Sequence, residues 1–318
     1  MNPSIDELTD KAEMLEEQGD LNEALGAYQE ALRYYRTPYL LYRYGSLALL
    51  CGNTSEARSS LLSAIEIAPR FPAPYLRLGV LDIDRGHYES AKTFLQKGLE
   101  VEEGPAMYTL LGVAQRRLGL QSEAIDSFRR AIEIDPAYEE AYYNLAVMIS
   151  SERPDEAWRL LDVSLRLDPQ YEEAERELGW VLRRLESYDA AEYHLRKAIE
   201  LDSSDGWAYL YLGNLQWARN DGESAEETFK TALQVWPSES IAHWCLGMFY
   251  HYNDRIQEAE FYYDAAVRLD SSDPQANFRF GIFLKELGEA TRAKTHLERV
   301  LQLDPENEEA KLALAEID

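Results

Sequence analysis

The 318-residue sequence predicts an all-α solenoid in which nine helix–turn–helix repeats of about 34 residues follow one another along the chain. Three observations predict it. An alanine recurs every 33 or 34 residues, a small residue precedes it by twelve positions (eleven in the fifth repeat), and another small residue usually follows it by seven. Because small residues let helix backbones approach closely, three of them at fixed offsets specify tightly packed helix pairs.

The recurring alanine is assigned here to position 20 of the repeat. The alanines at this position are Ala24, Ala57, Ala91, Ala124, Ala157, Ala191, Ala225, Ala259 and Ala293. Position 8 is occupied by Ala12, Gly45, Gly79, Gly112, Ala146, Gly179, Gly213, Gly247 and Gly281. The fifth repeat lacks one residue, which we place at its inner turn near Arg153 and Pro154.

Large residues and turn residues recur at the same period. Position 7 is mostly leucine, as in Leu178 and Leu212, and positions 4, 7, 8 and 11 lie on one stripe of a helix. Glycines mark the turn inside several repeats, at Gly19, Gly52, Gly86, Gly119 and Gly288. Prolines end helix B of several repeats, at Pro69, Pro136, Pro169, Pro237 and Pro305. Each repeat is therefore predicted to be two helices separated by a short turn.

These features predict a single solenoid over residues 1–318. Its repeats are expected at about 5–37, 38–71, 72–104, 105–138, 139–171, 172–205, 206–239, 240–273 and 274–307. Ser4 and Glu7 form a capping-box pattern at the start of the first helix. Residues 308–317 are expected to form a C-terminal helix that covers the ninth repeat.

The pattern resembles the tetratricopeptide repeat family. The run from Glu123 through Asp135-Pro136, followed by Tyr142 to Ala146, is similar to the consensus of that family, and the resemblance covers about residues 5–307. It implies a right-handed superhelix in which the first helix of each repeat, helix A, lines a concave groove. It also implies a scaffold that binds other proteins, with no particular partner.

In that family, positions 2, 5, 9 and 12 of helix A line the groove, and many of these positions are apolar here. We therefore hypothesise that the groove binds an apolar or amphipathic peptide, with its centre in repeats six to eight and with arginines and His251 at its rim. The candidate groove residues are Tyr42, Leu76, Val80, Val113, Tyr143, Val147, Arg176, Trp180, Arg183, Trp207, Leu210, Asn214, Trp217, Trp244, Met248, His251, Phe278 and Ile282. The alternative is that these side chains pack against helix A of the neighbouring repeat.

No sequence feature predicts an enzyme. The five histidines form no metal-binding motif, and the glycines form no phosphate-binding loop, so we expect no catalytic residue, no metal site and no cofactor. Carboxylate pairs such as Glu139-Glu140 lie near predicted helix N-termini, where the helix dipole explains them. Cys51 and Cys245 are far apart and are expected to be free thiols.

The net charge of −26 disfavours nucleic acids and anionic membranes as partners. It suits basic or neutral partners, and it is equally consistent with a surface charge that only keeps the protein in solution. No apolar stretch is long enough to span a bilayer and no secretory signal is recognisable, so a cytoplasmic location is expected. Two interpretations remain: an adaptor that binds another protein, and a homo-oligomer in which the groove accepts a terminal helix of another copy.

Overall fold

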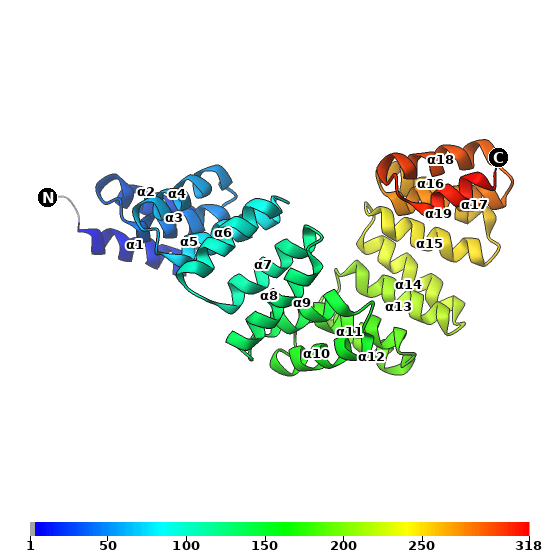
Figure 1. Ribbon diagram of the computed structural model, residues 1–318, viewed down its shortest axis with the longest axis horizontal. Helices are drawn as coiled ribbons and strands as arrows, with labels where there is room; N and C mark the ends of the chain where they lie inside the picture. Colours follow the sequence, from blue (N-terminus) through cyan, green and yellow to red (C-terminus); the bar gives the residue numbers. More distant parts are fainter. Residues whose placement is uncertain (1–3, 318) are drawn as a thin grey trace. The chain divides into compact units, whose positions relative to one another are not determined.

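The computed structural model describes residues 4–317, which form nineteen α-helices and no strand (Figure 1). The helices are α1 (Ile5–Glu17), α2 (Leu21–Tyr34), α3 (Pro38–Leu50), α4 (Thr54–Ile67), α5 (Pro72–Asp84), α6 (Tyr88–Val101), α7 (Pro105–Arg117), α8 (Gln121–Ile134), α9 (Glu139–Ile149), α10 (Pro154–Leu167), α11 (Glu172–Arg184), α12 (Tyr188–Leu201), α13 (Gly206–Ala218), α14 (Gly222–Val235), α15 (Ser240–Tyr252), α16 (Ile256–Leu269), α17 (Pro274–Glu286), α18 (Ala290–Leu303) and α19 (Glu308–Ala315). The first eighteen form nine consecutive pairs, which confirms the predicted fold class. Odd-numbered members of the pairs are helices A and even-numbered members are helices B.

Glycine at position 8 is what allows the two helices of a pair to touch. A Cβ atom added to Gly179 would lie 2.5 Å from Leu195 Cγ, and one added to Gly112 would lie 2.6 Å from Phe128 Cε1. Position 20 is buried in every repeat, as Ala191 and Ala225 illustrate. The small residues therefore act as the sequence predicts, because a larger side chain would separate helix A from helix B.

The turn inside a repeat requires one residue in the left-handed conformation. Gly19, Gly52, Gly86, Gly119 and Gly288 all have φ between 74° and 83°. Repeats six to eight place non-glycine residues there, namely Glu186, Asn220 and Asp254, with φ between 56° and 62°. In the fifth repeat, helix α9 stops at Ile149 after 11 residues, whereas the other helices A have 13. This shortening agrees with the missing residue expected near Arg153.

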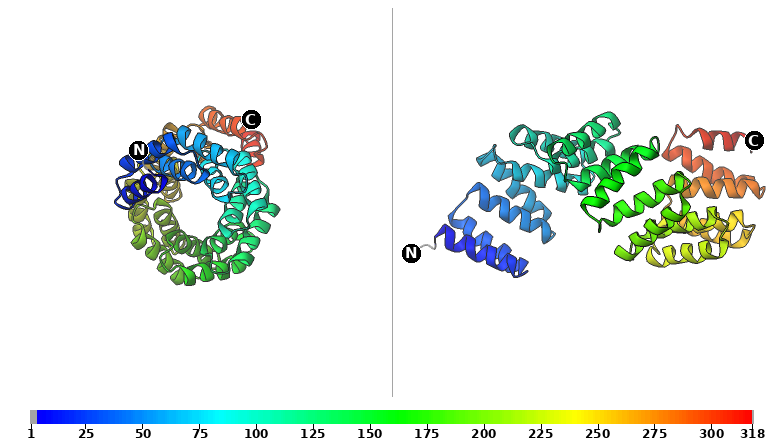
Figure 2. Two further views of the ribbon diagram at one scale, coloured as in Figure 1. Left: turned by 90° about the vertical axis from the view of Figure 1, so that its left-hand side faces the viewer. Right: turned by 90° about the horizontal axis from the view of Figure 1, so that it is seen from below.

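The helices form two compact units that divide between Asp168 and Pro169. Unit 1 contains α1 to α10, and unit 2 contains α11 to α19 (Figures 1 and 2). Within each unit, helix A packs on helix B of its own repeat, helix B packs on the next helix A, and consecutive helices A also touch. The repeats continue in the sequence across the division, and one uninterrupted solenoid over residues 1–318 stays a prediction.

Both ends of the described chain carry the expected caps. The backbone N–H of Ser4 donates to Glu7 Oε2 at 2.9 Å, and the N–H of Glu7 donates to Ser4 Oγ at 3.2 Å, which confirms the capping box. At the other end, α19 buries Ala310 and Ala313, and Ile317 packs on the core of unit 2. The helix expected over residues 308–317 ends at Ala315.

Candidate functional site

Two neighbouring helices A of unit 2, α13 and α15, are rich in apolar and aromatic residues on the face predicted to bind a ligand. We use the name helix-A face of unit 2 for positions 2, 5, 6, 9, 12 and 13 of α11, α13, α15 and α17. Helix α13 (GWAYLYLGNLQWA) has no charged residue, and α15 (SIAHWCLGMFYHY) has only two histidines. Position 2 of these helices is occupied by Glu173, Trp207, Ile241 and Gln275. Aromatic and aliphatic side chains therefore dominate the middle of this face.

Most of the predicted groove residues remain accessible. In unit 2, Trp207 is 38% exposed, and in unit 1 all predicted residues are partly exposed. The partly exposed residues are Tyr42, Leu76, Val80, Val113, Tyr143, Val147, Arg176, Trp180, Arg183, Asn214, Trp217, Trp244, Met248, His251, Phe278 and Ile282. Leu210 is the exception and requires a correction. It is 1% exposed and belongs to the buried cluster that contains Cys245 and Phe249 of the next repeat, so no ligand can reach it.

The first aromatic group on this face surrounds Trp207. Its ring centroid lies 5.8 Å from that of Tyr211 and 5.8 Å from that of Trp236, which meets it edge-on. Gly206 makes this contact possible, because a Cβ atom there would lie 2.2 Å from the Trp236 ring. Trp236 follows α14 in the turn before α15, so the helical periodicity could not identify it.

The second aromatic group lies at the C-terminal ends of α13 and α15. Trp217 contacts Phe249 and Tyr252, with centroid distances of 5.7 and 5.5 Å. Tyr252 is 65% exposed and stacks on His251 at 5.4 Å. His251 also forms an ion pair with Glu286, with 2.8 Å between His251 Nε2 and Glu286 Oε2. Tyr252 occupies position 13, which the sequence hypothesis did not include.

Several predicted groove residues also pack against the core. Trp217, Trp244 and Met248 lie against the buried cluster of unit 2. In unit 1, the ring of Tyr42 meets Phe71 edge-on at 5.3 Å, and Leu76 packs on a buried cluster. The alternative of packing between repeats therefore describes part of the stripe. Trp207 and Tyr252 are the aromatic residues of this face that combine high exposure with neighbouring aromatic support.

The predicted rim arginines differ in their environments. Arg176 forms an ion pair with Asp205, the N-cap of α13, and both side chains are largely buried. Arg176 therefore joins repeats six and seven, and its expected role as a rim contact stays a prediction. The guanidinium of Arg184 lies 5.0 Å from the Trp180 ring centroid. Arg183 has no ion-pair partner within residues 4–317.

The described residues contain no arrangement that resembles a metal centre. No group of three or more His, Cys, Asp or Glu side chains in residues 4–317 could hold a metal ion. Both cysteines are free, and burial raises the pKa of the Cys245 thiol well above its usual range, so this thiol stays protonated. In the same range no helix has the length and apolar character needed to cross a membrane.

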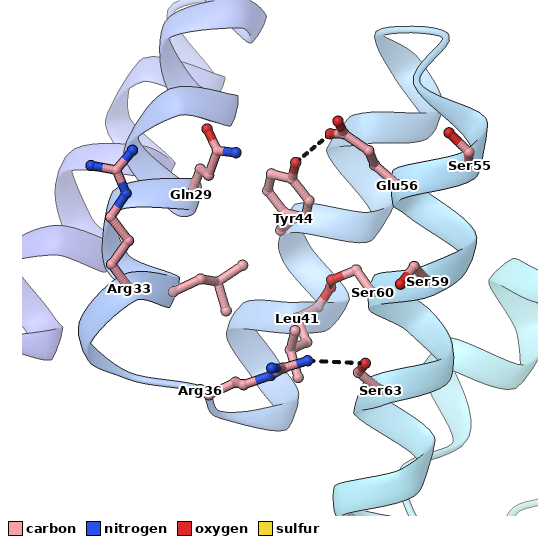
Figure 3. A pocket seen from close by; sticks show the side chains of 11 residues that line it. Gln29, Arg33, Arg36, Leu41, Tyr44, Ser55, Glu56, Ser59, Ser60 and Ser63 are labelled. Carbon is pink, nitrogen blue, oxygen red and sulfur yellow. Dashed lines mark hydrogen bonds between the residues drawn. The ribbon is translucent and has the colours of Figure 1, made fainter.

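A separate hollow of about 560 Å³ lies in unit 1, between α2 and α4 (Figure 3). Its wall on α4 consists of four serines and Glu56, and its other side carries Arg33 and Arg36. The Tyr44 hydroxyl donates to Glu56 Oε2 at 2.6 Å, and Arg36 Nη2 donates to Ser63 Oγ at 3.3 Å. Ser59 and Ser60 stand at positions where repeat six has Tyr193 and His194, and these small side chains leave the space open. Most of the residues that line the hollow are polar, unlike those in the middle of the helix-A face of unit 2.

Known proteins resemble this chain in both sequence and fold. The family model described as "Tetratricopeptide repeat" matches residues 9–71, 149–206 and 210–274, and related repeat models match 112–148, 182–237 and 274–307. The TPR repeat-containing protein YpiA of Bacillus subtilis is 23% identical over 197 residues, which cover 58% of this chain and 46% of that protein. The chain thus spans about half the length of this relative.

Two solved structures are similar in fold. A tetratricopeptide repeat protein from Parabacteroides merdae has a TM-score of 0.64 and 20% identity, over 77% of this chain and 98% of its own. Yeast Tom70 has a TM-score of 0.58 and 16% identity, over 98% of this chain and 88% of its own. The spacing of small residues, the helix pairs and the matches over more than half of the sequence lead to one assignment: this chain belongs to the tetratricopeptide repeat family.

Proposed function

We propose that this protein is an adaptor that binds an apolar or amphipathic segment of another polypeptide on the helix-A face of unit 2. Tetratricopeptide repeat proteins generally mediate protein–protein interactions. The observation that carries the proposal is the pair of supported, exposed aromatic groups around Trp207 and Tyr252. Aromatic side chains held in place by their neighbours lose little conformational freedom on binding, and they anchor many protein interfaces.

The binding mode follows from the shape of the aromatic groups. Each consists of a partly exposed ring that rests on a second ring of the same unit, as Trp207 rests on Trp236. A partner side chain inserted beside such a ring would remove apolar surface from water without reordering the protein. A segment that reaches both groups would bury on the order of 1,200 Å² in total, which is typical of transient complexes.

The test is a comparison of two matched double variants of the full chain. Trp207→Ser/Tyr252→Ser removes the two most exposed aromatic residues of the helix-A face. Tyr193→Ser/Phe261→Ser removes two aromatic residues on helices B of the same unit that are at least as exposed. Partners are captured from a native extract and identified by mass spectrometry, and each variant is first checked for an unchanged helical circular dichroism spectrum.

The proposal expects proteins that the wild type and the Tyr193/Phe261 variant capture and that the Trp207/Tyr252 variant loses. If all three proteins capture the same partners, the helix-A face of unit 2 is not the binding surface. If the Tyr193/Phe261 variant alone loses partners, the interaction belongs to the helix-B side, and the proposal is wrong.

A second candidate function is self-association. Leu312 on the terminal helix α19 is 65% exposed, which offers an apolar contact to the groove of another copy. This proposal expects a sedimentation coefficient that rises with protein concentration and a Leu312→Lys variant that stays monomeric. A wild-type protein that stays monomeric over an about 100-fold range of protein concentration would exclude self-association.

A further inference from the structure

The hollow of unit 1 has the size and the mixed lining of a small-ligand site. Its volume of about 560 Å³ falls within the range of pockets that hold small molecules. Leu41 and Tyr44 are buried and lie between the walls that α2 and α4 provide (Figure 3). A ligand between these two helices B would therefore find apolar contact from α3 and polar side chains on either side.

The α2 side of the hollow carries two arginines that no carboxylate neutralises. Neither Arg33 nor Arg36 forms an ion pair within residues 4–317, although Glu30 is one helical turn from Arg33. The Arg36 guanidinium donates to Ser63 Oγ, an uncharged acceptor, at 3.3 Å. The arginines at the position of Arg33 in repeats five and eight each pair with an aspartate of their own helix. Both arginines at the hollow are exposed and can therefore meet an anion from outside the chain.

The α4 side presents small hydroxyl side chains. Positions 18, 22, 23 and 26 of the second repeat are Ser55, Ser59, Ser60 and Ser63, and no other repeat has serine at all four. The Ser60 hydroxyl donates to the carbonyl oxygen of Leu41 at 2.9 Å. The hydroxyls of Ser55 and Ser59 have no hydrogen-bond partner in the part of the chain that the structure describes. These two hydroxyls are therefore available as donors to a ligand.

Glu56 determines which end of the hollow suits an anion. It lies in the first turn of α4, where its Oε2 accepts a hydrogen bond from the Tyr44 hydroxyl at 2.6 Å. Ser63, which Arg36 contacts, follows Glu56 by seven residues, or about 10 Å along the helix. A negative group is therefore repelled from the Glu56 end and attracted to the Arg36 end. At physiological salt the net charge of −26 is screened beyond about 8 Å, so these local charges dominate.

We propose that the hollow of unit 1 binds a phosphomonoester. The phosphate lies between Arg36 and the serines of α4, Arg33 closes over it from α2, and the organic part of the ligand rests on Leu41 and Tyr44. This site is separate from the helix-A face of unit 2. A free small molecule and a phosphorylated side chain both carry this group, and the experiment distinguishes them.

The donors favour a phosphate over a carboxylate. A phosphomonoester carries a charge of nearly −2 at neutral pH, which two guanidinium groups balance. Its three terminal oxygens accept hydrogen bonds from several directions, and the hollow offers donors on two walls, Arg33 on α2 and Ser59 on α4. A carboxylate has two oxygens in one plane, and a single arginine satisfies both.

The experiment measures binding to the full chain by saturation-transfer NMR at about 150 mM sodium chloride. The probes are phenyl phosphate, benzoate and a phosphoserine capped at both ends. Arg33→Gln/Arg36→Gln removes the two arginines. Ser59→Tyr keeps them and fills the hollow with the residue that repeat six has at this exposed position. The matched control is Arg166→Gln/Arg268→Gln, which makes the same charge change at exposed positions of other helices B.

The proposal expects saturable binding of phenyl phosphate to the wild type at about millimolar concentration, at least about fivefold tighter than benzoate. Arg33→Gln/Arg36→Gln should weaken it at least about tenfold, because the charged donors are lost. Ser59→Tyr should weaken it by a similar factor, because the phenol occupies the space. The Arg166/Arg268 control should change it less than about twofold. An unchanged helical circular dichroism spectrum is required of each variant.

Three results would overturn the proposal: no saturable binding of phenyl phosphate up to about 20 mM, equal affinities for phenyl phosphate and benzoate, or undiminished binding by the Arg33/Arg36 variant. The capped phosphoserine identifies the source of the phosphate. If it binds more tightly than phenyl phosphate, the site takes a phosphorylated side chain, and if it binds more weakly, the site takes a free small molecule. None of these variants alters the helix-A face of unit 2, so failure here leaves the proposed function standing.

Discussion

At the scale of single residues, the inner turn of the sixth repeat carries a strained backbone. Glu186 has φ of 59°, in the region that glycine occupies in five other repeats. A side chain in this conformation costs about 1 kcal/mol, because its Cβ approaches the following carbonyl. Glu186 is exposed. Glu186→Gly should therefore raise the free energy of unfolding by about 0.5–1 kcal/mol in urea denaturation.

The control is Glu186→Ala, which removes the same charge and keeps the Cβ. It should leave the stability close to that of the wild type. A glycine variant no more stable than the alanine variant would show that the turn is not strained. Asn220 and Asp254 occupy the same turn position, but their short polar side chains tolerate the left-handed region better than glutamate does.

Individual site residues show where reasoning from sequence stops. The repeat pattern placed Trp207 on the helix-A face, because this placement depends only on spacing within one helix. Leu210 has the same kind of position, and its burial is decided by the neighbouring repeat, which packs Cys245 and Phe249 near it. Trp236 lies outside any helix, and only the folded turn brings it to Trp207. The repeat period therefore predicts which face of a helix a residue lies on, and contacts between repeats determine whether that residue is exposed.

At the scale of helices, the spacing within a pair depends on glycine at position 8. Gly179→Ala would place a Cβ 2.5 Å from Leu195 Cγ and 3.1 Å from the carbonyl oxygen of Ala191. Because the backbone oxygen cannot turn away, α11 and α12 must separate. We expect a loss of about 1–3 kcal/mol in the free energy of unfolding.

The same substitution at Gly26 is the matched control. Gly26 lies inside α2, and a Cβ there would have no atom within 4 Å. Gly26→Ala should stabilise the protein by about 0.5–1 kcal/mol, since alanine is the better helix former. The two variants are compared in one set of urea titrations. Equal effects of the two substitutions would mean that helix propensity, and not close approach, explains the glycine pattern.

Helices α11 and α12 are also joined by a buried carboxylate. Glu175 is 1% exposed, and its oxygens lie 2.6 Å from His194 Nδ1 and 2.5 Å from Lys197 Nζ. Burial alone would raise the pKa of Glu175, but the hydrogen bonds to His194 and Lys197 outweigh it and lower this pKa. The stability that Glu175 contributes is therefore complete above the unfolded-state pKa, near 4.3, and is lost as the pH falls through the lower folded-state pKa.

Glu175→Gln should consequently cost about 1.5–3 kcal/mol at pH 7. Below about pH 4 the difference from the wild type should shrink, because protonation removes the same charge from the wild type. Unfolding free energies between pH 3 and pH 7 measure this directly. Glu200→Gln, an exposed change in α12, should have no such pH dependence. A pH-independent difference for Glu175→Gln would contradict the assignment.

At the scale of the whole molecule, the sequence predicted the number of repeats but not the division into two units. Its 33- to 34-residue period continues without interruption past Asp168 and Pro169, and this turn resembles the other turns between repeats. The period reports how each helix packs on its neighbours. It carries little information about how cooperative the repeats are, because that depends on the strength of each interface between them.

The distribution of tryptophan allows the cooperativity of the two units to be measured. Trp158 lies in unit 1, and the other five tryptophans lie in unit 2. In a Trp158→Phe variant, tryptophan fluorescence therefore reports on unit 2 alone, whereas far-ultraviolet circular dichroism reports on every helix.

Unit 2 also contains the large buried cluster with Phe229, Phe249 and Phe280, whose burial strongly opposes unfolding. If the two units unfold separately, the two midpoints differ. We expect the fluorescence midpoint in urea to lie above the circular dichroism midpoint, because unit 2 is then the more stable unit. Coincident midpoints at several protein concentrations would instead show that all nine repeats unfold together, and that the division at Asp168 has no energetic counterpart.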